Sequence, residues 1–247
     1  MNKKITQLKK YLNSSSIITI LSGAGLSTAS GLPDFRTDDQ GFWKKNKPVH
    51  FGEFVQSKSA RIKSWQNNHA IRASIKDKKP SLMHGYIVEL LRKNKLNTHI
   101  TQNIDGLHYL EEIKSQIIEL HGSVFNASCL NCLKKYDPAT FYKSKVKELG
   151  STSCTSCNDG YVKTSTISFG QKLDEQQIKK ATLASRRCDL FICLGTSLKV
   201  SPANQFPQKA KARDVNLVII NREPTPLDAI ADLVIYDDLD SIYEKIK

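Results

Sequence analysis

The sequence predicts an α/β protein built on a mainly parallel sheet that is covered by helices on both faces. Short apolar runs alternate along the chain with helical stretches, a pattern typical of strand–helix–strand units. The runs lie at residues 17–21, 98–102, 117–120, 190–194, 217–220 and 233–236. Helices are expected at residues 5–12, 82–92 and 175–185.

Polar or glycine residues directly follow five of these runs. They are Gly23 and Gly25, Asn103 and Asp105, His121 and Gly122, Gly195 with Thr196 and Ser197, and Asn221 with Glu223. The carboxyl ends of parallel strands share one edge of a sheet, and ligands of open α/β sheets bind there. This convergence predicts a ligand site at that edge.

Two stretches interrupt the alternation of strands and helices. Residues 36–80 are polar, basic and of helical character, and residues 123–164 contain four of the six cysteines. We interpret both as inserts that form a small second lobe. The large lobe then comprises residues 1–35, 81–122 and 165–247, within a single domain of two lobes.

The chain of 247 residues has an excess of basic side chains, 37 Lys and Arg against 24 Asp and Glu, hence a net charge of +13. The lysines are dispersed and no block of five like charges occurs, so we interpret the charge as surface composition rather than a nucleic-acid site. No apolar run approaches the ~20 residues that cross a bilayer. We therefore expect a cytoplasmic protein without a membrane partner; the oligomeric state stays undetermined.

Two Cys-x-x-Cys pairs, Cys129 with Cys132 and Cys154 with Cys157, are separated by 21 residues. This spacing is typical of one structural zinc ion held by four thiolates. Cys188 and Cys193 lie in or beside an apolar run and are predicted to be buried side chains of the core.

The Gly23-Ala24-Gly25 turn after the first run permits close approach of a phosphate to the backbone, and the N-terminus of the following helix would offer free N–H groups. The full G-x-G-x-x-G pattern is not met, because position 28 is Thr. Asn221 and Glu223 are candidates for binding ribose hydroxyls. A carboxylate at that place favours NAD over its 2′-phosphorylated form.

Longer strings carry a resemblance to a known family. Residues 23–36, GAGLSTASGLPDFR, resemble the signature of the sirtuins, the NAD-dependent protein lysine deacylases. Residues 101–108 (TQNIDGLH), the pair His121-Gly122, the cysteine pairs, residues 195–200 (GTSLKV) and residues 221–223 (NRE) follow in the family's order. The resemblance covers about residues 15 to 238.

The resemblance implies a Rossmann-like lobe and a small zinc-binding and helical lobe, with NAD and an acylated lysine entering the cleft between them. His121 would be the general base, with Asn103 as a second catalytic residue. The implied NAD-binding residues are Gly23, Ala24, Gly25, Ser27, Thr28, Asp34, Phe35, Arg36, Gln102, Asn103, Ile104, Asp105, Gly195, Thr196, Ser197, Asn221, Arg222 and Glu223. Phe169, Gly170 and Val200 would contact the substrate peptide. His84 and His108 are interpreted as structural hydrogen-bonding residues.

The chain departs from the family pattern at two places. The segment that lines the peptide cleft commonly ends in Gly-Glu, whereas here Ser168 precedes Phe169 and Gln171 follows Gly170. No Tyr-x-x-Arg pair, the family's determinant for succinyl and malonyl groups, occurs between residues 36 and 80. Acidic acyl groups are therefore not expected to be preferred, while acetyl and longer apolar chains remain open.

Three alternatives remain at this point. A protein ADP-ribosyltransferase would also consume NAD, although a base at His121 suits deacylation better. A zinc-ribbon nucleic-acid-binding protein would explain the cysteines and the charge, but not the polar strand ends. An NAD-sensing or NAD-hydrolysing regulator would release nicotinamide without forming acyl-ADP-ribose.

Overall fold

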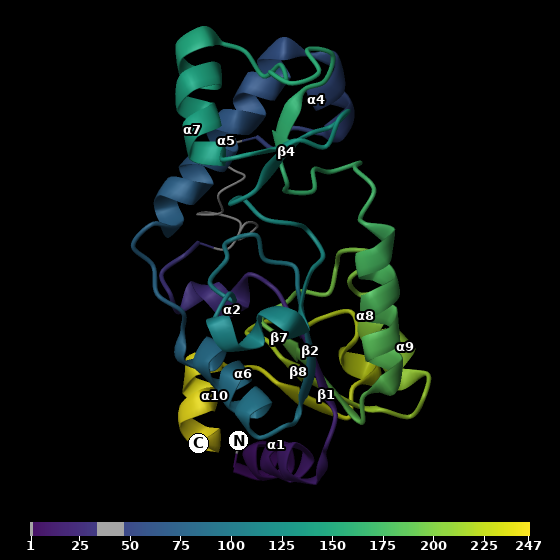
Figure 1. Ribbon diagram of the computed structural model, residues 1–247. Helices are drawn as coiled ribbons and strands as arrows, with labels where there is room; N and C mark the ends of the chain where they lie inside the picture. Colours follow the sequence, from purple (N-terminus) through teal and green to yellow (C-terminus); the bar gives the residue numbers. More distant parts are fainter. Residues whose placement is uncertain (1, 34–46) are drawn as a thin grey trace.

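The computed structural model describes residues 2–33 and 47–247, with the side chains of residues 111 and 112 left aside. The chain forms two lobes, with α1 (Asn2–Ser14) and the C-terminus at the far end of the larger one (Figure 1). No helix in the described ranges is long and apolar enough to span a membrane.

The larger lobe is built on a six-stranded parallel sheet in the order β3-β2-β1-β7-β8-β9. Its strands are β1 (Ile18–Ser22), β2 (Leu96–Thr101), β3 (Ile117–Glu119), β7 (Leu190–Leu194), β8 (Asn216–Ile220) and β9 (Leu233–Ile235). Counted within the sheet, the order is 3-2-1-4-5-6, which is that of a dinucleotide-binding fold. The predicted doubly wound α/β class is confirmed.

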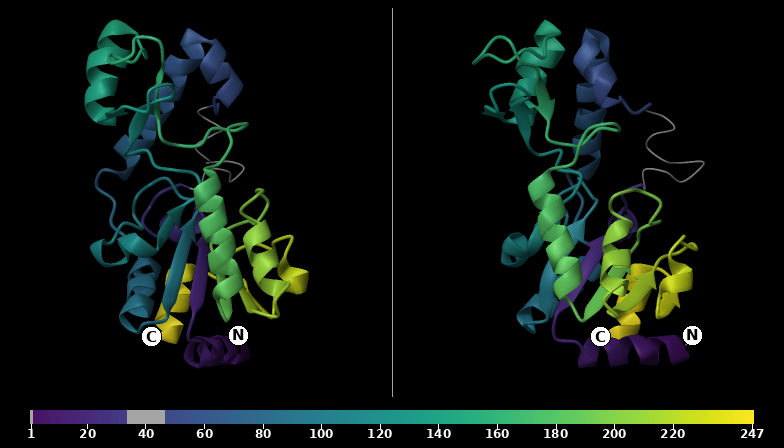
Figure 2. Two further views of the ribbon diagram at one scale, coloured as in Figure 1. Left: turned by 45° about the vertical axis from the view of Figure 1, so that its right-hand side comes forward. Right: turned by 90° about the vertical axis from the view of Figure 1, so that its right-hand side faces the viewer.

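Helices cover both faces of this sheet (Figure 2). The face packed by α1, α6 (Leu82–Arg92) and α10 (Leu239–Ile246) buries alternate strand residues such as Ile18 and Ile20. The face packed by α8 (Glu175–Arg187) and α9 (Gln205–Lys211) buries the residues between them, such as Leu21. Each buried aliphatic side chain contributes about 1.5–3 kcal/mol, so both faces must be covered for the sheet to be stable. This explains why the strands appear in the sequence as continuous apolar runs.

The smaller lobe joins a helical part to a three-stranded antiparallel sheet. The helical part comprises α4 (Phe51–Gln56) and α5 (Lys58–Ile75), and α7 (Pro138–Phe141) continues into η2 (Tyr142–Lys147). The sheet has the order β5-β4-β6, formed by β4 (Ala127–Cys129), β5 (Lys135–Tyr136) and β6 (Val162–Thr164). Trp65 of α5 connects the two parts, because its indole stacks on Phe141 at 5.1 Å and donates to the backbone oxygen of Val162 at 2.9 Å.

Strand order reverses between β1 and β7. From β1 the chain continues to β2 and β3 on one side, whereas β7, β8 and β9 extend on the other. In open α/β sheets the loops at the carboxyl ends diverge at such a point and leave a crevice for ligands. Three short elements lie in the connections of this sheet: α2 (Gly25–Thr28) after β1, η1 (Glu111–Gln116) between β2 and β3, and η3 (Asp228–Ile230) between β8 and β9.

Candidate active site and zinc centre

Two glycines bring the loops after β1 and β7 into contact. The Gly25 N–H donates to the backbone oxygen of Gly195 at 2.9 Å. A Cβ on Gly25 would lie 2.7 Å from the Gly195 Cα, so only glycine permits this approach. Gly195 also has a φ of +57°, which glycine adopts at no steric cost. The glycines of two separate sequence motifs thus form one contact at the reversal point.

Helix α2 differs from the helix expected after the glycine turn. It is a single turn, and the N–H groups of Gly25, Leu26 and Ser27 already donate to nearby backbone oxygens. The Thr28 hydroxyl likewise donates to the Gly25 oxygen at 3.0 Å. The prediction of free N–H groups at this helix start is therefore wrong for these three residues, because Gly25 donates to the loop after β7 and the other two N–H groups donate within the turn.

A buried polar chain links the loops after β1 and β2. The Ser27 hydroxyl donates to Asp105 Oδ2 at 2.8 Å and accepts from Asn103 Nδ2 at 3.2 Å. Asp105 Oδ1 accepts from the Leu107 N–H at 3.0 Å. Asn103 and Asp105 are only 2% and 4% exposed. Three predicted site residues therefore form one hydrogen-bonded unit, although Asn103 and Asp105 lie 76 and 78 positions after Ser27 in the sequence.

His121 is held by the end of β2. Its Nδ1 lies 2.9 Å from the backbone oxygen of Gln102, and a carbonyl oxygen can only accept, so Nδ1 carries the proton. In the neutral ring the lone pair is then on Nε2, the form that can take a proton from a substrate hydroxyl. The Gln102 side chain points to the neighbouring loop, where its Nε2 donates to Thr196 Oγ1 at 2.9 Å.

The backbone on both sides of His121 is anchored. Gly122 has a φ of +68°, and a Cβ at this position would collide with the backbone oxygen of Ser165. The Ile167 N–H donates to the His121 oxygen at 2.9 Å. The segment that returns from the small lobe thus packs directly on the His121-Gly122 pair, which fixes the position of the imidazole.

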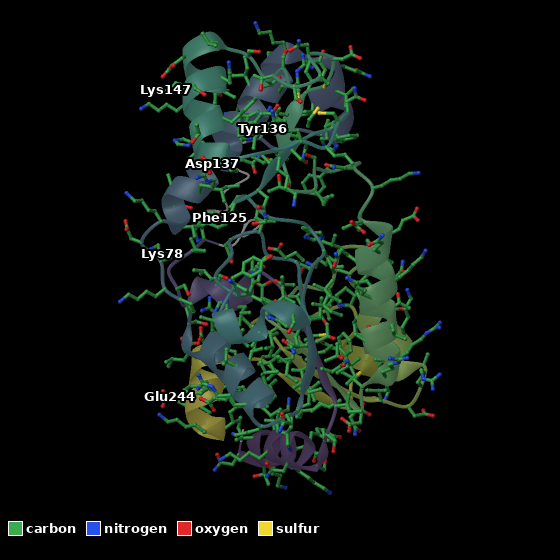
Figure 3. All side chains as sticks on the ribbon, viewed as in Figure 1. Lys78, Phe125, Tyr136, Asp137, Lys147 and Glu244 are labelled. Carbon is green, nitrogen blue, oxygen red and sulfur yellow. The ribbon has the colours of Figure 1, made fainter. Side chains whose placement is uncertain are left out.

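A pocket opens beside the buried polar chain. It is lined by Ala24, Ser27, Leu32, Pro33, Asp105 and the α5 residues Ile71, Ser74 and Ile75. Ile104 packs on the same α5 isoleucines from the loop after β2. Phe125, which lies between the two lobes in Figure 3, packs its ring over Gly106. The pocket therefore combines the strand ends of the large lobe with one apolar helix face of the small lobe.

The four cysteines of the two Cys-x-x-Cys pairs come together in the small lobe, where Figure 3 labels the neighbouring Tyr136. Their sulfur atoms all lie within 4.8 Å of one another. Cys129 and Cys157 are 3.8 Å apart, and Cys132 and Cys154 are 3.6 Å apart. A tetrahedron with zinc–sulfur bonds of ~2.3 Å has edges of about 3.8 Å, so the four thiolates fit a zinc ion.

Backbone N–H groups complete this cluster. Asn131 and Ser156 each donate from the backbone to a cysteine sulfur at 3.3 Å. Such bonds favour the thiolate form that binds metal. Four protein ligands leave no open position on a zinc ion, which makes the centre structural. Cys188 and Cys193 are buried elsewhere, as predicted.

Comparison with known proteins identifies the family. The Sir2 family model matches residues 23–202, the span from the first glycine to the loop after β7. The chain belongs to the Sir2 family. An NAD-dependent protein deacetylase 1 of Bradyrhizobium diazoefficiens is 42% identical over 236 residues, covering 95% of this chain and 92% of that protein. An NAD-dependent protein deacetylase of Rhodopseudomonas palustris is 38% identical, covering 97% and 94%.

Solved Sir2 structures share the arrangement of both lobes. A Sir2 protein bound to a propionylated peptide superimposes with a TM-score of 0.85 at 31% identity, covering 98% of this chain and 97% of the other. A Sir2 protein bound to an acetylated peptide gives the same TM-score, identity and coverage. Both lobes are thus common to this chain and to peptide-bound members of the Sir2 family.

The segment around Phe169 and Gly170, which the resemblance predicts to contact the substrate peptide, lies against α4. The Phe51 N–H donates to the Phe169 oxygen at 2.9 Å, and the His50 and Phe169 rings lie 5.7 Å apart. Phe169 is 44% exposed, unusual for so large an apolar side chain. Val200 is half-buried in the loop after β7, where its oxygen accepts from the Asn204 N–H.

The structure also explains one departure from the sirtuin pattern. The Gln171 N–H donates to the Ser168 oxygen at 3.0 Å, and the Ser168 N–H donates to Gln171 Oε1 at 3.1 Å. An amide oxygen therefore closes the turn around Gly170, whose φ is +79°. Because a carboxylate would be needed here only as an acceptor, glutamine preserves the turn while removing a charge.

The remaining predicted cofactor residues have separate positions. Asn221 Nδ2 donates to the Glu223 backbone oxygen at 2.8 Å, which closes the loop after β8 and leaves the Glu223 side chain exposed. Arg222 forms an ion pair with Asp238 at the start of α10. Ser197 is half-buried in the loop after β7. Asp34, Phe35 and Arg36 lie outside the described residues.

Some residues of the site were not anticipated from the sequence. Ile71, Ser74 and Ile75 line the pocket, and their i, i+3 and i+4 spacing within the helical insert was the available signal. Glu119, which hydrogen-bonds His108 Nε2 at 3.1 Å, is the last residue of β3 and lies within the apolar run at residues 117–120. Its position in sequence gave no indication of that partner.

Proposed function

We propose that this chain is an NAD-dependent protein lysine deacetylase in which His121 is the general base. The observation that supports this most directly is the bond from His121 Nδ1 to the Gln102 oxygen, which presents Nε2 as the basic atom at the strand-end edge. The relatives named NAD-dependent protein deacetylases and the Sir2 structures with acylated peptides agree with this activity.

NAD, when bound, supplies an electrophilic ribose carbon that accepts the acyl oxygen of the substrate as nicotinamide leaves. His121 Nε2 then takes the proton of a ribose hydroxyl, whose oxygen forms a bond to the former acyl carbon. Water adds to that carbon, whose bonds to the lysine nitrogen and to the oxygen attached to the ribose in the first step both break, and the proton held by His121 passes to the leaving nitrogen. The products are free lysine and 2′-O-acyl-ADP-ribose, with nicotinamide from the first step. Asn103 orients the hydroxyl or the water through its amide.

The polar chain of Ser27, Asn103 and Asp105 forms the nicotinamide side of the NAD site. Asp105 accepts from the carboxamide, and Ile104 packs beside it. Gly23, Ala24, Gly25 and Thr28, together with Gly195, Thr196 and Ser197, border the phosphates. The Gln102 side chain donates a hydrogen bond to Thr196 at this edge of the sheet. Asn221 and Glu223 contact the ribose that does not carry nicotinamide. Asp34, Phe35, Arg36 and Arg222 are assigned by resemblance alone.

The protein substrate is an acylated lysine within an extended segment. Its backbone would pair between the segment holding Phe169 and Gly170 and the loop holding Val200, as an added strand. Pairing through the backbone tolerates many sequences, so the acyl-lysine rather than its neighbours is the main determinant. The zinc ion, bound by Cys129, Cys132, Cys154 and Cys157, stabilises the small lobe and does not enter the chemistry.

The test is mass spectrometry of the purified protein with NAD and an acetyl-lysine peptide. We expect equal amounts of nicotinamide, deacetylated peptide and acetyl-ADP-ribose, and loss of all three products in His121→Ala. His69→Ala is the matched control, because this exposed histidine stacks on Tyr142 in the small lobe.

Each alternative leaves a different product. Peptide that gains the mass of ADP-ribose would indicate a transferase, and free ADP-ribose with intact acetyl-peptide would indicate an NAD hydrolase. If His121→Ala retained full deacetylation, the assignment of the general base would be wrong even though the activity stood.

A further inference from the structure

Three histidines are buried together beneath the strand ends. His84 lies in the first turn of α6, His99 lies on β2 and His108 lies in the loop after β2, with exposures of 2%, 0% and 1%. The rings of His99 and His108 meet edge to face with centroids 6.2 Å apart. Burial and the neighbouring His108 lower the pKa of His84 to about 3, and burial lowers the pKa of His99 well below its usual value. Both rings are therefore neutral at physiological pH.

Hydrogen bonds determine which nitrogen of His84 carries the proton. His84 takes the place of the glutamate in a capping box, where its Nδ1 accepts from the Ser81 N–H at 3.1 Å. The Ser81 hydroxyl lies 2.9 Å from the same Nδ1 and also reaches the Leu26 oxygen at 3.1 Å. A neutral ring that accepts at Nδ1 has its proton on Nε2. His84 therefore presents one N–H donor on its far side.

The proton on His99 is determined in the same way. The Ser22 hydroxyl donates to Thr101 Oγ1 at 3.0 Å, so its oxygen accepts from His99 Nε2, 2.8 Å away. The lone pair of His99 is then on Nδ1. Thr101 Oγ1 in turn accepts from the Asn103 N–H at 3.0 Å. A continuous chain of bonds therefore runs from His99 to the backbone of Asn103.

His108 has two carboxylates as neighbours. Its Nε2 lies 3.1 Å from Glu119 Oε1, and its Nδ1 lies 3.8 Å from Asp105 Oδ1. The bond to Glu119 requires the proton on Nε2, so the neutral ring has its lone pair on Nδ1. At 3.8 Å this atom is beyond direct hydrogen bonding to Asp105.

Three ring nitrogens remain unsatisfied by protein within the described part of the chain. His84 Nε2, His99 Nδ1 and His108 Nδ1 are buried and have no hydrogen-bonding partner there. A buried polar atom without a partner costs about 1–3 kcal/mol, so three together would be a large penalty. With His108 neutral, the set consists of one donor and two acceptors, and a water molecule that accepts once and donates twice matches this set.

A metal ion does not suit this place. Among the described residues, only the four zinc-site cysteines bring three or more ligand atoms within 4.8 Å of one another. The donor on His84 would also have to lose its proton to bind a cation. Buried waters, in contrast, typically make about three hydrogen bonds to polar atoms that lack protein partners.

We propose that His84, His99 and His108 bind one buried water molecule, and that His99 and His108 are thereby positioning residues for Asn103 and Asp105. This rests on the roles proposed above for those two residues. The water joins the chain Asn103–Thr101–Ser22–His99 to His108, which lies between Asp105 and Glu119. Asn103 and Asp105 are thus connected beneath the pocket by a hydrogen-bond network that does not contact the substrate.

Two substitutions at position 99 separate a positioning role from a packing role. In His99→Leu the side chain keeps much of the volume but neither nitrogen, whereas in His99→Asn the amide oxygen replaces the Nδ1 acceptor. We expect a crystal structure of the wild type to contain the water and that of His99→Leu to lack it. With ¹⁵N-labelled histidine, NMR should place the protons of His84 and His99 on Nε2, with a shifted His84 signal in His99→Leu.

The kinetic readout uses the same pair of variants at a temperature where both are folded. Misplacement of site groups lowers kcat more than substrate binding, so we expect His99→Leu to lose about tenfold in kcat with less than about twofold change in the peptide KM. His99→Asn should recover most of the loss. Unchanged kcat in His99→Leu, an anhydrous cluster in the wild type, or protons on Nδ1 would each overturn the proposal.

These measurements also distinguish this proposal from the proposed function. The water and the tautomers are observed without turnover. If wild-type protein formed no acetyl-ADP-ribose, the proposed function would fail while the water site could still be verified. If deacetylation required His121 but ignored position 99, only the positioning role would be wrong.

Discussion

His121 Nδ1 lies 2.9 Å from the backbone oxygen of Gln102, so the candidate base is oriented by the loop after β2 that also holds Asn103. The two residues are 19 positions apart, on the loops after the neighbouring strands β3 and β2. Because the acceptor is a backbone atom, substitution of the Gln102 side chain cannot remove it. The orientation of His121 depends instead on the backbone around it, and especially on Gly122.

Gly122→Ala should disable the enzyme through the backbone. The new Cβ would collide with the Ser165 oxygen, and the φ of +68° disfavours alanine. We expect a loss of about 1–3 kcal/mol in unfolding free energy and at least a tenfold fall in deacetylase kcat. Chemical denaturation and steady-state kinetics measure the two effects.

Gly85→Ala is the control for that variant. Gly85 is exposed on α6 and its Cβ would meet nothing within 4 Å. Alanine in a helix interior should raise stability by about 1 kcal/mol and leave kcat unchanged. Equal activity of both variants would contradict the role given to the His121-Gly122 backbone.

Removal of one zinc ligand should unfold the small lobe. Cys132→Ser leaves three thiolates, and we expect the zinc content to fall from one per chain to near zero by elemental analysis. Trp65 is buried beside the cysteine cluster, so its fluorescence should shift toward that of an exposed indole. Cys188→Ser, at a buried cysteine outside the cluster, should retain the metal. Full zinc occupancy in Cys132→Ser would contradict the four-thiolate assignment.

Acid should destabilise the protein through its buried histidines. The folded-state pKa of His84 is lowered to about 3, so between pH 6.5 and that value the unfolded chain binds a proton that the folded chain cannot. Stability is therefore present above pH 6.5 and is lost as pH falls through this window. For His84 alone we expect a loss of about 2 kcal/mol between pH 7 and pH 5, measured by urea denaturation.

His99 should add to the same acid loss, because its pKa is also lowered. The slope of unfolding free energy against pH should therefore be shallower in His99→Leu than in the wild type. The pKa of the exposed His69 is lowered less, by partial burial and by Arg72 and Lys147, so His69→Leu should flatten the slope less than His99→Leu does. Identical slopes for His99→Leu and the wild type would mean that His99 titrates normally in the folded chain.

Lys163 should extend the same dependence, stability rising with pH, to the alkaline range. This lysine of β6 is 2% exposed, and its ammonium donates to the backbone oxygens of Thr164 and Thr166. Burial lowers its pKa to about 8, so between pH 8 and its ordinary value of 10.5 the unfolded chain binds more protons. Stability should rise by about 1 kcal/mol from pH 7 to pH 9. Lys163→Met should abolish that rise, and a rise that persisted would have to come from another group.

Much of the architecture was predictable because it depends on local patterns. Strands buried on both faces must be apolar at successive positions, and so the six runs marked the six strands to within about two residues. The cysteine spacing predicted the four-sulfur cluster, since a Cys-x-x-Cys turn brings two sulfurs within reach of one metal ion. Both expectations needed only residues that are close in sequence or regular in period.

Other features depended on contacts that no local pattern contains. The Gly25 N–H donates to Gly195 in the loop after β7, and the pocket includes Ile71 and Ile75 because α5 packs over the strand ends. The sequence predicts structural roles for His84 and His108, but it gives no role for His99.

The sequence by itself therefore determined the strands, the class of fold, the zinc ligands and the candidates at the strand ends. Only the tertiary structure decided which of those candidates touch, such as Ser27 with Asp105, and which ring nitrogen of each histidine holds a proton. The physical reason is that periodicity and propensity act over a few residues, whereas a hydrogen bond in the site depends on the packing of segments 19 to 170 residues apart.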